Sequence, residues 1–447
     1  FYKAKDKNEQ ANKTHTFLNL LHLRSVHYLV PWYKLARTCL VLNDMNRMFY
    51  KLINITIFLF VAMANTHGVA ESVIHRGNRG EPDTLDPHKT VNGWEASIAM
   101  ELFTGLTAFG PAGQILPAMA KEWSVSDDGL TYTWHLRDGL KWSDGEAFTA
   151  ADFVYSFRRL FDPVTASSFA SLLYPIKGSR AVNTGATSPM NLAVTAHDDL
   201  TLVMELEHPT PYLPQILIHR GLPVPRHVVE KIGQRWSHPR TFVGNGAFTL
   251  AEWVPQTHVR LNANPLFFEA PAVALDALYF HPTENLSTAI DRFRAGEIDI
   301  VPSVPHDRLV WIKDNMPTSL RVNPSLGVEY LAFNVERTPF GDSNIRRALS
   351  MAIDRDILVG RFLKGREVGA YSIVHPGVMG GLGPYRPEFL APESEVRLSQ
   401  ALALLNQAGY SESNPLSIEL RFNNQDIVSA TMEVVSRMWS RAGGMRW

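Results

Sequence analysis

Histidines and paired acidic residues are the side chains of this sequence that suit metal binding or acid–base catalysis. The 16 histidines are scattered, and pairs such as His219 and His227 lack the clustering of a metal site. The pairs Asp127–Asp128 and Asp198–Asp199 are typical of turns rather than of a catalytic carboxylate dyad. The sequence has no GxSxG, HExxH, P-loop or CxxC motif. We therefore expect no catalytic residue, no metal and no cofactor.

The segment Asn245-Gly246-Ala247-Phe248 combines residue types that suit contact with a solute. A glycine lets the backbone approach a ligand closely, and an aromatic ring offers a flat wall. The alternative is a β-turn in which Asn245 and Gly246 supply positive φ angles. Asn245, Gly246 and Phe248 are therefore candidate ligand-binding residues, with a structural role open for each.

The elements that position such residues are clearest in residues 129–160, GLTYTWHLRDGLKWSDGEAFTAADFVYSFRRL. Apolar and polar residues alternate over 131–136, which predicts a half-buried strand. Thr149 and Asp152 have the spacing of a capping box. The helix that follows has an apolar stripe that begins at Phe153.

Further patterns predict interleaved strands and helices, which indicates an α/β or α+β protein. Strands are predicted over 200–206, 259–261, 277–280, 297–301 and 418–422. Helices are predicted after caps at Ser287 and Ser343, before glycine stops at Gly296 and Gly409, and over 428–441.

Length and composition describe a soluble globular protein with more than one domain. The chain has 447 residues, of which 45% are hydrophobic and 19% charged. Its formal net charge of −1 gives no electrostatic indication of a nucleic-acid partner. Cys39 is the single cysteine, so no disulfide framework is available.

Residues 45–70 have the layout of a signal peptide. Arg47 and Lys51 precede the apolar run INITIFLFVAMA, and a small-residue cleavage site follows at Ala70. The run is shorter than the roughly 20 residues of a membrane span, and a buried core helix is the alternative. Residues 1–44 begin without Met and show no sustained period, so we expect a non-native upstream extension rather than an authentic one.

Short motifs follow one another along the chain, over about residues 73–442. They are Thr84–His88, Glu101–Leu106, Leu116–Trp123, Lys141–Gly145, Val243–Phe248, Asn264–Phe268, Arg294–Asp299 and Ile345–Arg355. Their ordered set resembles the family 5 solute-binding proteins of ABC importers, which are oligopeptide- and dipeptide-binding proteins. The intervening sequence is most similar to the oligopeptide-binding branch.

This resemblance implies an α/β fold of the two-lobed periplasmic binding protein type, in the class with an additional inserted domain. We expect the first lobe at residues 71–103 and 229–330, and the inserted domain at 104–228. The second lobe, at 331–447, is expected to be incomplete, because members of the family continue beyond this length.

The function that the resemblance implies is capture of short peptides in the periplasm and their delivery to an inner-membrane ABC permease. The protein would be a monomer, exported by a cleavable signal peptide, without a nucleic-acid partner. One alternative is a non-peptide solute such as a nickel chelate, haem or a sugar on the same fold. Another is a non-functional fragment of a disrupted gene. A secreted hydrolase is disfavoured, because no nucleophile–base pair can be assembled.

The resemblance also assigns candidate ligand-binding residues in the first lobe and inserted domain. Phe169 falls where the oligopeptide branch has a tyrosine over the ligand, so packing is kept and a hydroxyl hydrogen bond is lost. A core aromatic is the alternative. Asn92 and Gly93 follow the Thr84–His88 motif, where the first lobe meets ligand. Val91 stands where an acid is common, which argues against recognition of a basic group there.

Residues 327–334 are expected to enter the second lobe as a strand that contacts ligand. Alternation places Tyr330 and Asn334 on the opposite face from Glu329, and of these two faces we prefer Tyr330 with Asn334 as ligand-binding residues, with plain strand packing as the alternative. The aspartate that pairs with the peptide ammonium group in this family is expected beyond Trp447. Because a buried ammonium without a counter-charge is costly, the sequence as given is not expected to bind peptide normally.

Overall fold

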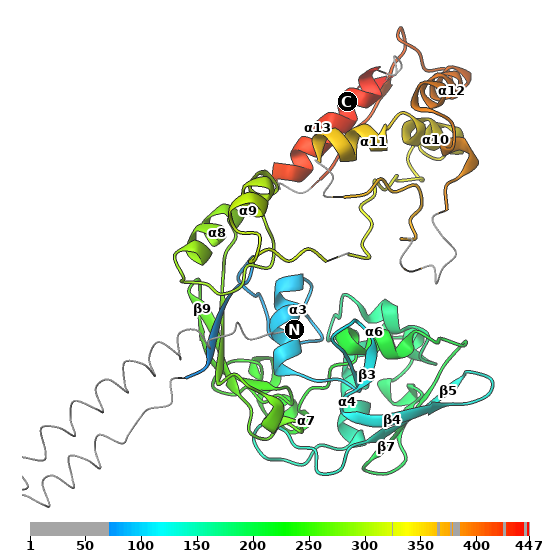
Figure 1. The fold of residues 1–447 in the computed structure, drawn as a ribbon. Helices are drawn as coiled ribbons and strands as arrows, with labels where there is room; N and C mark the ends of the chain where they lie inside the picture. Colours follow the sequence, from blue (N-terminus) through cyan, green and yellow to red (C-terminus); the bar gives the residue numbers. More distant parts are fainter. Residues whose placement is uncertain are drawn as a thin grey trace, which may run out of the picture. The chain divides into compact units, whose positions relative to one another are not determined.

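The computed structural model describes residues 71–323, 325–363, 367–375, 378, 385–422, 426–441 and 445–446. The predicted upstream extension, the signal peptide and the cleavage site at Ala70 lie outside these residues. The chain divides into two compact units, with unit 1 ending at Pro302 and unit 2 beginning at Ser303. Each unit is described by itself, and its elements are drawn in Figure 1. No helix of the described residues combines the length and the apolar composition that crossing a membrane requires.

The first sheet of unit 1 joins the start of the described chain to a hairpin far along the sequence. Its order is β1-β10-β9-β8, with β1 parallel to β10 and the other pairs antiparallel. Leu278 and Phe280 on β10 are buried, while Tyr279 and His281 alternate with them toward the opposite face. The strands are β1 (Val73–Gly77), β8 (Phe248–Val254), β9 (His258–Ala263) and β10 (Ala277–His281).

Helices and loops from two separate parts of the chain cover the buried face of this sheet. The core between them, called here the first core, contains Leu85, Ile98, Phe103, Trp236, Phe248, Leu261 and Phe280. The helical elements of this part are α3 (Gly93–Leu102), α7 (Arg226–Ile232), η3 (Gly233–Arg235), η4 (Ala270–Ala272) and α8 (Leu286–Arg294).

A second, fully antiparallel sheet in the order β4-β5-β7-β6 carries the other core of unit 1. Its strands are β4 (Ala120–Val125), β5 (Thr131–Leu136), β6 (Val194–Ala196) and β7 (Thr201–Glu205). Helix α4 (Ala150–Phe161) packs on this sheet (Figure 1) and buries Phe153, Phe157, Leu160 and Phe161. The predicted capping box is confirmed, because the Thr149 backbone N–H donates to Asp152 Oδ2 at 2.8 Å. The predicted half-buried strand at 131–136 is confirmed as well.

Smaller elements surround this second core. They are β2 (Thr107–Phe109), β3 (Ile115–Pro117), η1 (Ala170–Leu173), α5 (Ser179–Asn183), η2 (Pro189–Asn191) and α6 (Leu213–Arg220). The two cores of unit 1 draw on different stretches of chain, since the second core takes its members from 106–217 and from Val243. The boundaries predicted for an inserted domain at 104–228 stay a prediction.

Unit 2 packs helices around a core that contains Ile345, Leu349, Ala401, Leu405, Val435 and Trp439. The Trp439 ring N–H donates to the Leu349 carbonyl at 2.9 Å, so α13 is tied to α10. The elements are η5 (His306–Arg308), α9 (Leu309–Asn315), α10 (Ser343–Met351), α11 (Arg355–Ile357), η6 (Leu358–Phe362), η8 (Glu388–Leu390), α12 (Ser394–Gln407), β11 (Leu416–Ser417), α13 (Asp426–Arg441) and β12 (Met445–Arg446).

Two predicted helix starts were wrong by one or two residues. The Asn285 side chain accepts from the Thr288 N–H at 3.0 Å, and the Asp342 side chain accepts from the Asn344 N–H at 2.8 Å. Asn285 and Asp342 are therefore the N-caps in place of Ser287 and Ser343, and the two helices begin at Leu286 and at Ser343. The predicted glycine stops are confirmed, with φ of 77° at Gly296 and 87° at Gly409.

Three predicted strands are absent from the described residues. Residues 297–301 contribute only a bridge between Ile300 and Arg76, at the edge of β1. Residues 418–422 and 327–334 are not in strands. Alternation alone does not make a strand, because the backbone N–H and C=O groups need a partner strand to pair with.

Candidate functional site

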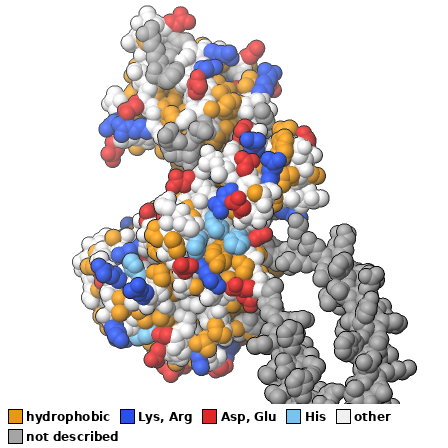
Figure 2. Space-filling model, turned by 90° about the vertical axis from the view of Figure 1, so that its left-hand side faces the viewer, with side chains coloured by type: hydrophobic (Ala, Val, Ile, Leu, Met, Phe, Trp, Pro, Cys, Tyr) orange, Lys and Arg blue, Asp and Glu red, His pale blue; other side chains and the backbone are white. Residues whose placement is uncertain are grey.

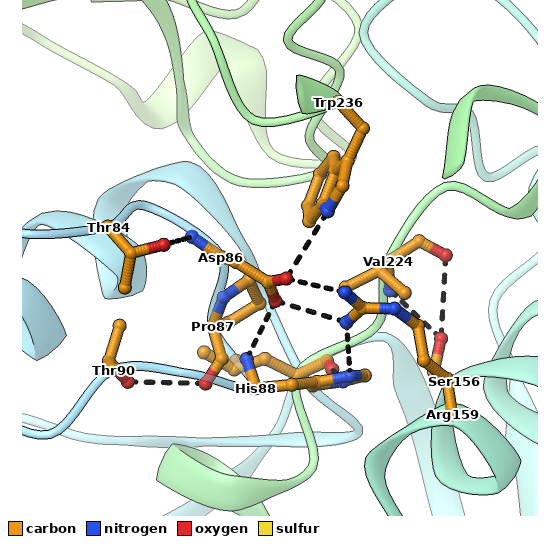
Figure 3. A network of polar contacts seen from close by, with 10 residues as sticks. Thr84, Asp86, Pro87, His88, Thr90, Ser156, Arg159, Val224 and Trp236 are labelled. Atoms are coloured by element: carbon orange, nitrogen blue, oxygen red, sulfur yellow. Dashed lines mark hydrogen bonds and ion pairs between the residues drawn. The ribbon is translucent and has the colours of Figure 1, made fainter. Parts of the chain in front are cut away.

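A buried ion pair joins the Thr84–His88 motif to helix α4 (Figure 3). Arg159 donates from Nη2 to Asp86 Oδ2 at 2.5 Å and from Nη1 to Asp86 Oδ1 at 3.1 Å. The Trp236 ring N–H donates to the same carboxylate at 3.3 Å. Burial by itself raises the pKa of Asp86, but the hydrogen bond and charge of Arg159 hold it below its ordinary value. The pair therefore links the two cores of unit 1.

His88 lies in the same network, and its protonation follows from its neighbours. Arg159 Nη1 lies 2.9 Å from His88 Nδ1, and a guanidinium only donates, so Nδ1 must accept. The proton of the neutral ring is then on Nε2, which donates to the Leu222 carbonyl at 3.0 Å. Burial, followed by the charge of Arg159, lowers the pKa of His88 to about 4.

The network also fixes the chain that leaves helix α6. His88 holds the Leu222 carbonyl, and Ser156 Oγ accepts from the Val224 N–H at 2.9 Å (Figure 3). Ahead of this turn, Thr107 Oγ1 donates to the Pro214 carbonyl at 2.7 Å. Helix α6 is therefore held at both ends by buried hydrogen bonds.

Asn92 and Gly93 begin helix α3. Asn92 is its N-cap, in a capping box with the buried Glu95, whose Oε2 accepts the Asn92 N–H at 3.0 Å. Gly93 is exposed, and a Cβ placed there would meet no atom within 4 Å. The structure thus gives Asn92 a helix-capping role and leaves Gly93 open; their predicted contact with ligand stays a prediction.

Asn245 and Gly246 lie against the other end of α3. Asn245 is buried, and its side chain accepts from the Thr104 N–H at 3.1 Å and donates to the Thr104 carbonyl at 2.8 Å. Neither Asn245 nor Gly246 has a positive φ, so the β-turn alternative was wrong. A Cβ on Gly246 would lie 2.3 Å from the Glu101 carbonyl oxygen. The close approach that the glycine permits is therefore to the protein's own backbone.

Phe248 is 5% exposed and belongs to the first core, at the start of β8. Its ring is thus a core aromatic in this structure, and a ligand contact by Phe248 stays a prediction. In unit 2, Tyr330 is 69% exposed and Asn334 is exposed, while Leu331 and Phe333 pack against the core. Glu329 is exposed as well, so exposure does not separate the two predicted faces, and a ligand contact by Tyr330 and Asn334 stays a prediction.

Phe169 has a partner that the sequence analysis missed. It is half-buried at the start of η1, and the Arg220 guanidinium carbon lies 3.6 Å above the centre of its ring. Next to this pair, the Phe109 and His219 rings lie 5.4 Å apart. Helix α6 thus brings a cation and a second aromatic to the residue that was predicted to contact ligand.

Histidine side chains also gather in one group in the space-filling view (Figure 2). His75 Nδ1 lies 3.0 Å from His281 Nε2, and Tyr279 stacks on His75 at 4.7 Å. Burial, then the charge of Arg292, lowers the pKa of His281 to about 4. Within the described ranges, no group of three or more His, Cys, Asp or Glu side chains is arranged to hold a metal ion.

The two-unit α/β architecture, with a mixed sheet and an added antiparallel sheet in unit 1, is that of the two-lobed periplasmic binding proteins. The family model "Bacterial extracellular solute-binding proteins, family 5 Middle" matches residues 114–444. The chain belongs to this family of solute-binding proteins. The predicted family and fold class are confirmed.

Several characterised relatives cover most of this chain. A probable deoxycholate-binding periplasmic protein of Escherichia coli, YgiS, is 38% identical over 85% of this chain and 71% of its own length. The periplasmic oligopeptide-binding protein OppA of Salmonella typhimurium is 34% identical over 83% of this chain and 68% of its own length.

Solved structures show the same fold. OppA of Haemophilus influenzae in complex with the peptide RPPGFSPFR has a TM-score of 0.76 at 30% identity, covering 83% of this chain and 74% of that one. The murein tripeptide-binding protein MppA of Escherichia coli has a TM-score of 0.77 at 34% identity, covering 85% and 74%.

Proposed function

We propose that this protein captures short peptides in the periplasm and delivers them to an inner-membrane ABC permease. The observation that carries the proposal is the likeness, at a TM-score of 0.76, to an OppA structure that holds a peptide. The OppA and MppA relatives, whose names give peptides as their ligands, support it. Both names also place these relatives in the periplasm, which supports the same location for this chain.

A protein of this kind must bind the peptide backbone strongly while it accepts many side chains. Hydrogen bonds to the backbone meet this need, because every peptide offers the same N–H and C=O groups. Bridging waters then adapt the pockets to different side chains. Binding of peptides with unrelated side chains at similar affinity is therefore the expected property.

The described residues divide into two roles under this proposal. Gly93, Phe169, Tyr330 and Asn334 are accessible or half-buried and remain proposed ligand contacts. The other four have structural contacts: Asn92 caps α3, Asn245 and Gly246 pack against the backbone at its other end, and Phe248 belongs to the first core. We propose that these four hold the site in shape.

Calorimetry on the native protein, purified from its host, tests the proposal. A tripeptide and a tetrapeptide with unrelated side chains are expected to bind with affinities within about tenfold of each other. Deoxycholate is the third titrant, because the 38% identical relative is described as a probable deoxycholate-binding protein. Tight binding of deoxycholate with no binding of either peptide would move the function to a non-peptide, amphipathic solute.

Export and domain organisation complete the proposal. We propose a signal peptide at 45–70, a first lobe at 71–103 and 229–330 with an inserted domain at 104–228, a second lobe at 331–447, and a monomeric mature protein. N-terminal sequencing of periplasmic material is expected to begin at Glu71. A secreted product that keeps residues 1–44 would contradict this.

A further inference from the structure

Arg220 carries a positive charge without an acidic partner among the residues that the structure describes. Its guanidinium is stacked on the Phe169 ring at 3.6 Å, and no hydrogen bond or ion pair joins it to another described residue. Partial burial lowers the pKa of Arg220, and no carboxylate offsets this effect. The stack occupies one face of the guanidinium, so the N–H donors in its plane remain available.

The charge around Arg220 has one sign. Three segments meet here: 104–118 with β2 and β3, 163–173 with η1, and 208–224 with α6. None of the three contains Asp or Glu, and Arg220 is their single Lys or Arg. The surface that these segments form therefore attracts an anion and offers it no competing acid.

Apolar side chains lie exposed beside the cation. Phe109 and Leu116, on the paired strands β2 and β3, are each 38% exposed, and Leu172 in η1 is 47% exposed. Phe109 lies 5.4 Å from the His219 ring, which precedes Arg220 in the chain. A solute that meets Arg220 therefore finds apolar surface next to the charge.

The subsite is built on a rigid support. The Thr107 hydroxyl holds helix α6 near its start. Just after Arg220, the His88 ring holds the Leu222 carbonyl. Two residues beyond Leu222, the Val224 backbone N–H donates to the Ser156 hydroxyl. On this support the stack on Phe169 positions the Arg220 guanidinium before a ligand binds, which favours affinity.

We propose that Phe169 and Arg220 form a subsite for the carboxylate of a solute whose neighbouring part is apolar. This inference rests on the proposed solute-binding function and deepens it, because it names the chemical group that is read. The Arg220 guanidinium donates two parallel hydrogen bonds to the carboxylate, while Phe169 fixes the guanidinium plane. The carboxylate is either the C-terminus of a short peptide or that of an amphipathic acid such as deoxycholate.

A purely structural reading of Arg220 makes a different prediction. A cation in the last turn of a helix interacts favourably with the free carbonyl groups there, and this needs no ligand. Under that reading, loss of Arg220 changes stability slightly and leaves the preference between a carboxylate and its amide untouched. The two readings are separated by measuring affinity and that preference together.

The test is calorimetry of the full-length protein with trileucine, trileucine amide, deoxycholate and the carboxamide of deoxycholate. The variants are Arg220→Met, which removes the charge and keeps an apolar stem, and Arg220→Lys, which keeps a charge but loses the planar stack. Arg180→Met is the matched control, because Arg180 also stacks on an aromatic ring, that of Tyr174 at 5.1 Å, and is exposed. Thermal unfolding confirms that each variant is folded.

The subsite predicts that the parent prefers a carboxylate over its amide and that Arg220→Met removes this preference, weakening acid binding about tenfold or more. The affinity of Arg220→Lys for the acids is expected to lie between those of the parent and of Arg220→Met, and that of Arg180→Met is expected to match the parent. An effect with trileucine assigns the peptide source; an effect with deoxycholate in a protein that binds no trileucine keeps the subsite but contradicts peptide capture. Trileucine binding that is insensitive to Arg220 or to the amide overturns the subsite and leaves the proposed function standing. No binding of any probe overturns both.

Discussion

Arg159 on helix α4 and Asp86 in the Thr84–His88 motif form a two-pronged ion pair, 2.5 and 3.1 Å long, between the two cores of unit 1. The Thr84–His88 motif therefore has a structural role in this chain. It holds the antiparallel-sheet part of unit 1 to the mixed-sheet part, and through His88 it also fixes the end of α6.

Removal of one partner of this pair is expected to be strongly destabilising. Arg159→Met leaves the Asp86 carboxylate buried without its counter-charge, which costs about 3–5 kcal/mol of unfolding free energy. Urea unfolding followed by tryptophan fluorescence measures the loss. The exposed Arg180→Met variant is the control and is expected to change stability by less than about 0.5 kcal/mol. A similarly small effect for Arg159→Met would show that the pair is not the link described here.

Acidification is expected to weaken the fold through His88. Its folded pKa of about 4 lies below the ordinary 6.5, so the unfolded chain binds more protons between these values. The stability that neutral His88 contributes is therefore complete above pH 6.5 and is lost as pH falls toward 4, by on the order of 3 kcal/mol. Asp86, whose pKa is also lowered, adds a loss in the same direction at more acidic pH.

The His88 ring resonances in an NMR titration report this directly. We expect a midpoint near 4, with unfolding setting in as the ring is protonated. A midpoint near 6.5 in the folded protein would contradict the buried, neutral ring that accepts from Arg159. Replacing His88 with glutamine should reduce the slope of stability against pH between 6.5 and 4.

Gly246 is expected to tolerate no side chain. A Cβ would lie 2.3 Å from the Glu101 carbonyl oxygen and 2.6 Å from the Phe103 nitrogen, and these are backbone atoms that cannot turn aside. Gly246→Ala should lower the unfolding free energy by about 1–3 kcal/mol or more. Gly93→Ala is the matched control, because nothing lies within 4 Å of a Cβ there; it should be neutral or slightly stabilising. Equal effects of the two substitutions would refute the close packing at α3.

Phe248 and Phe169 are expected to differ in what their loss costs. Phe248→Ala removes a core ring and should cost about 3–5 kcal/mol of stability. Phe169→Ala removes a half-buried ring on which Arg220 stacks, so this variant should lose much less stability. Chemical unfolding of both variants in parallel decides. If Phe169→Ala were the more destabilising of the two, Phe169 would be a structural residue rather than part of a binding surface.

Local patterns in the sequence predicted the local structure well. The alternation at 131–136 and the capping box at Thr149 and Asp152 need only neighbouring residues, and both are present. Strand assignment at 418–422 failed because a strand also depends on a partner elsewhere in the chain, and residues 297–301 pair with β1 at a single bridge only. The role of Gly246 was equally hidden, since the α3 backbone against which it packs is remote in sequence.

Arg220 was missed because its meaning depends on a contact with Phe169 that no spacing reveals. A usable signal was present all the same: the stretches 104–118, 163–173 and 208–224 lack acidic residues, and a lone arginine within them stands out.

The proposal that this chain is a peptide carrier is tested most directly by what it carries. Native mass spectrometry of the protein, purified without denaturation from its host, followed by sequencing of the released ligands, makes this measurement. The proposed function predicts a mixture of short peptides with unrelated side chains and free C-terminal carboxylates. A single non-peptide mass, reproduced across preparations and displaced by no peptide, would contradict it.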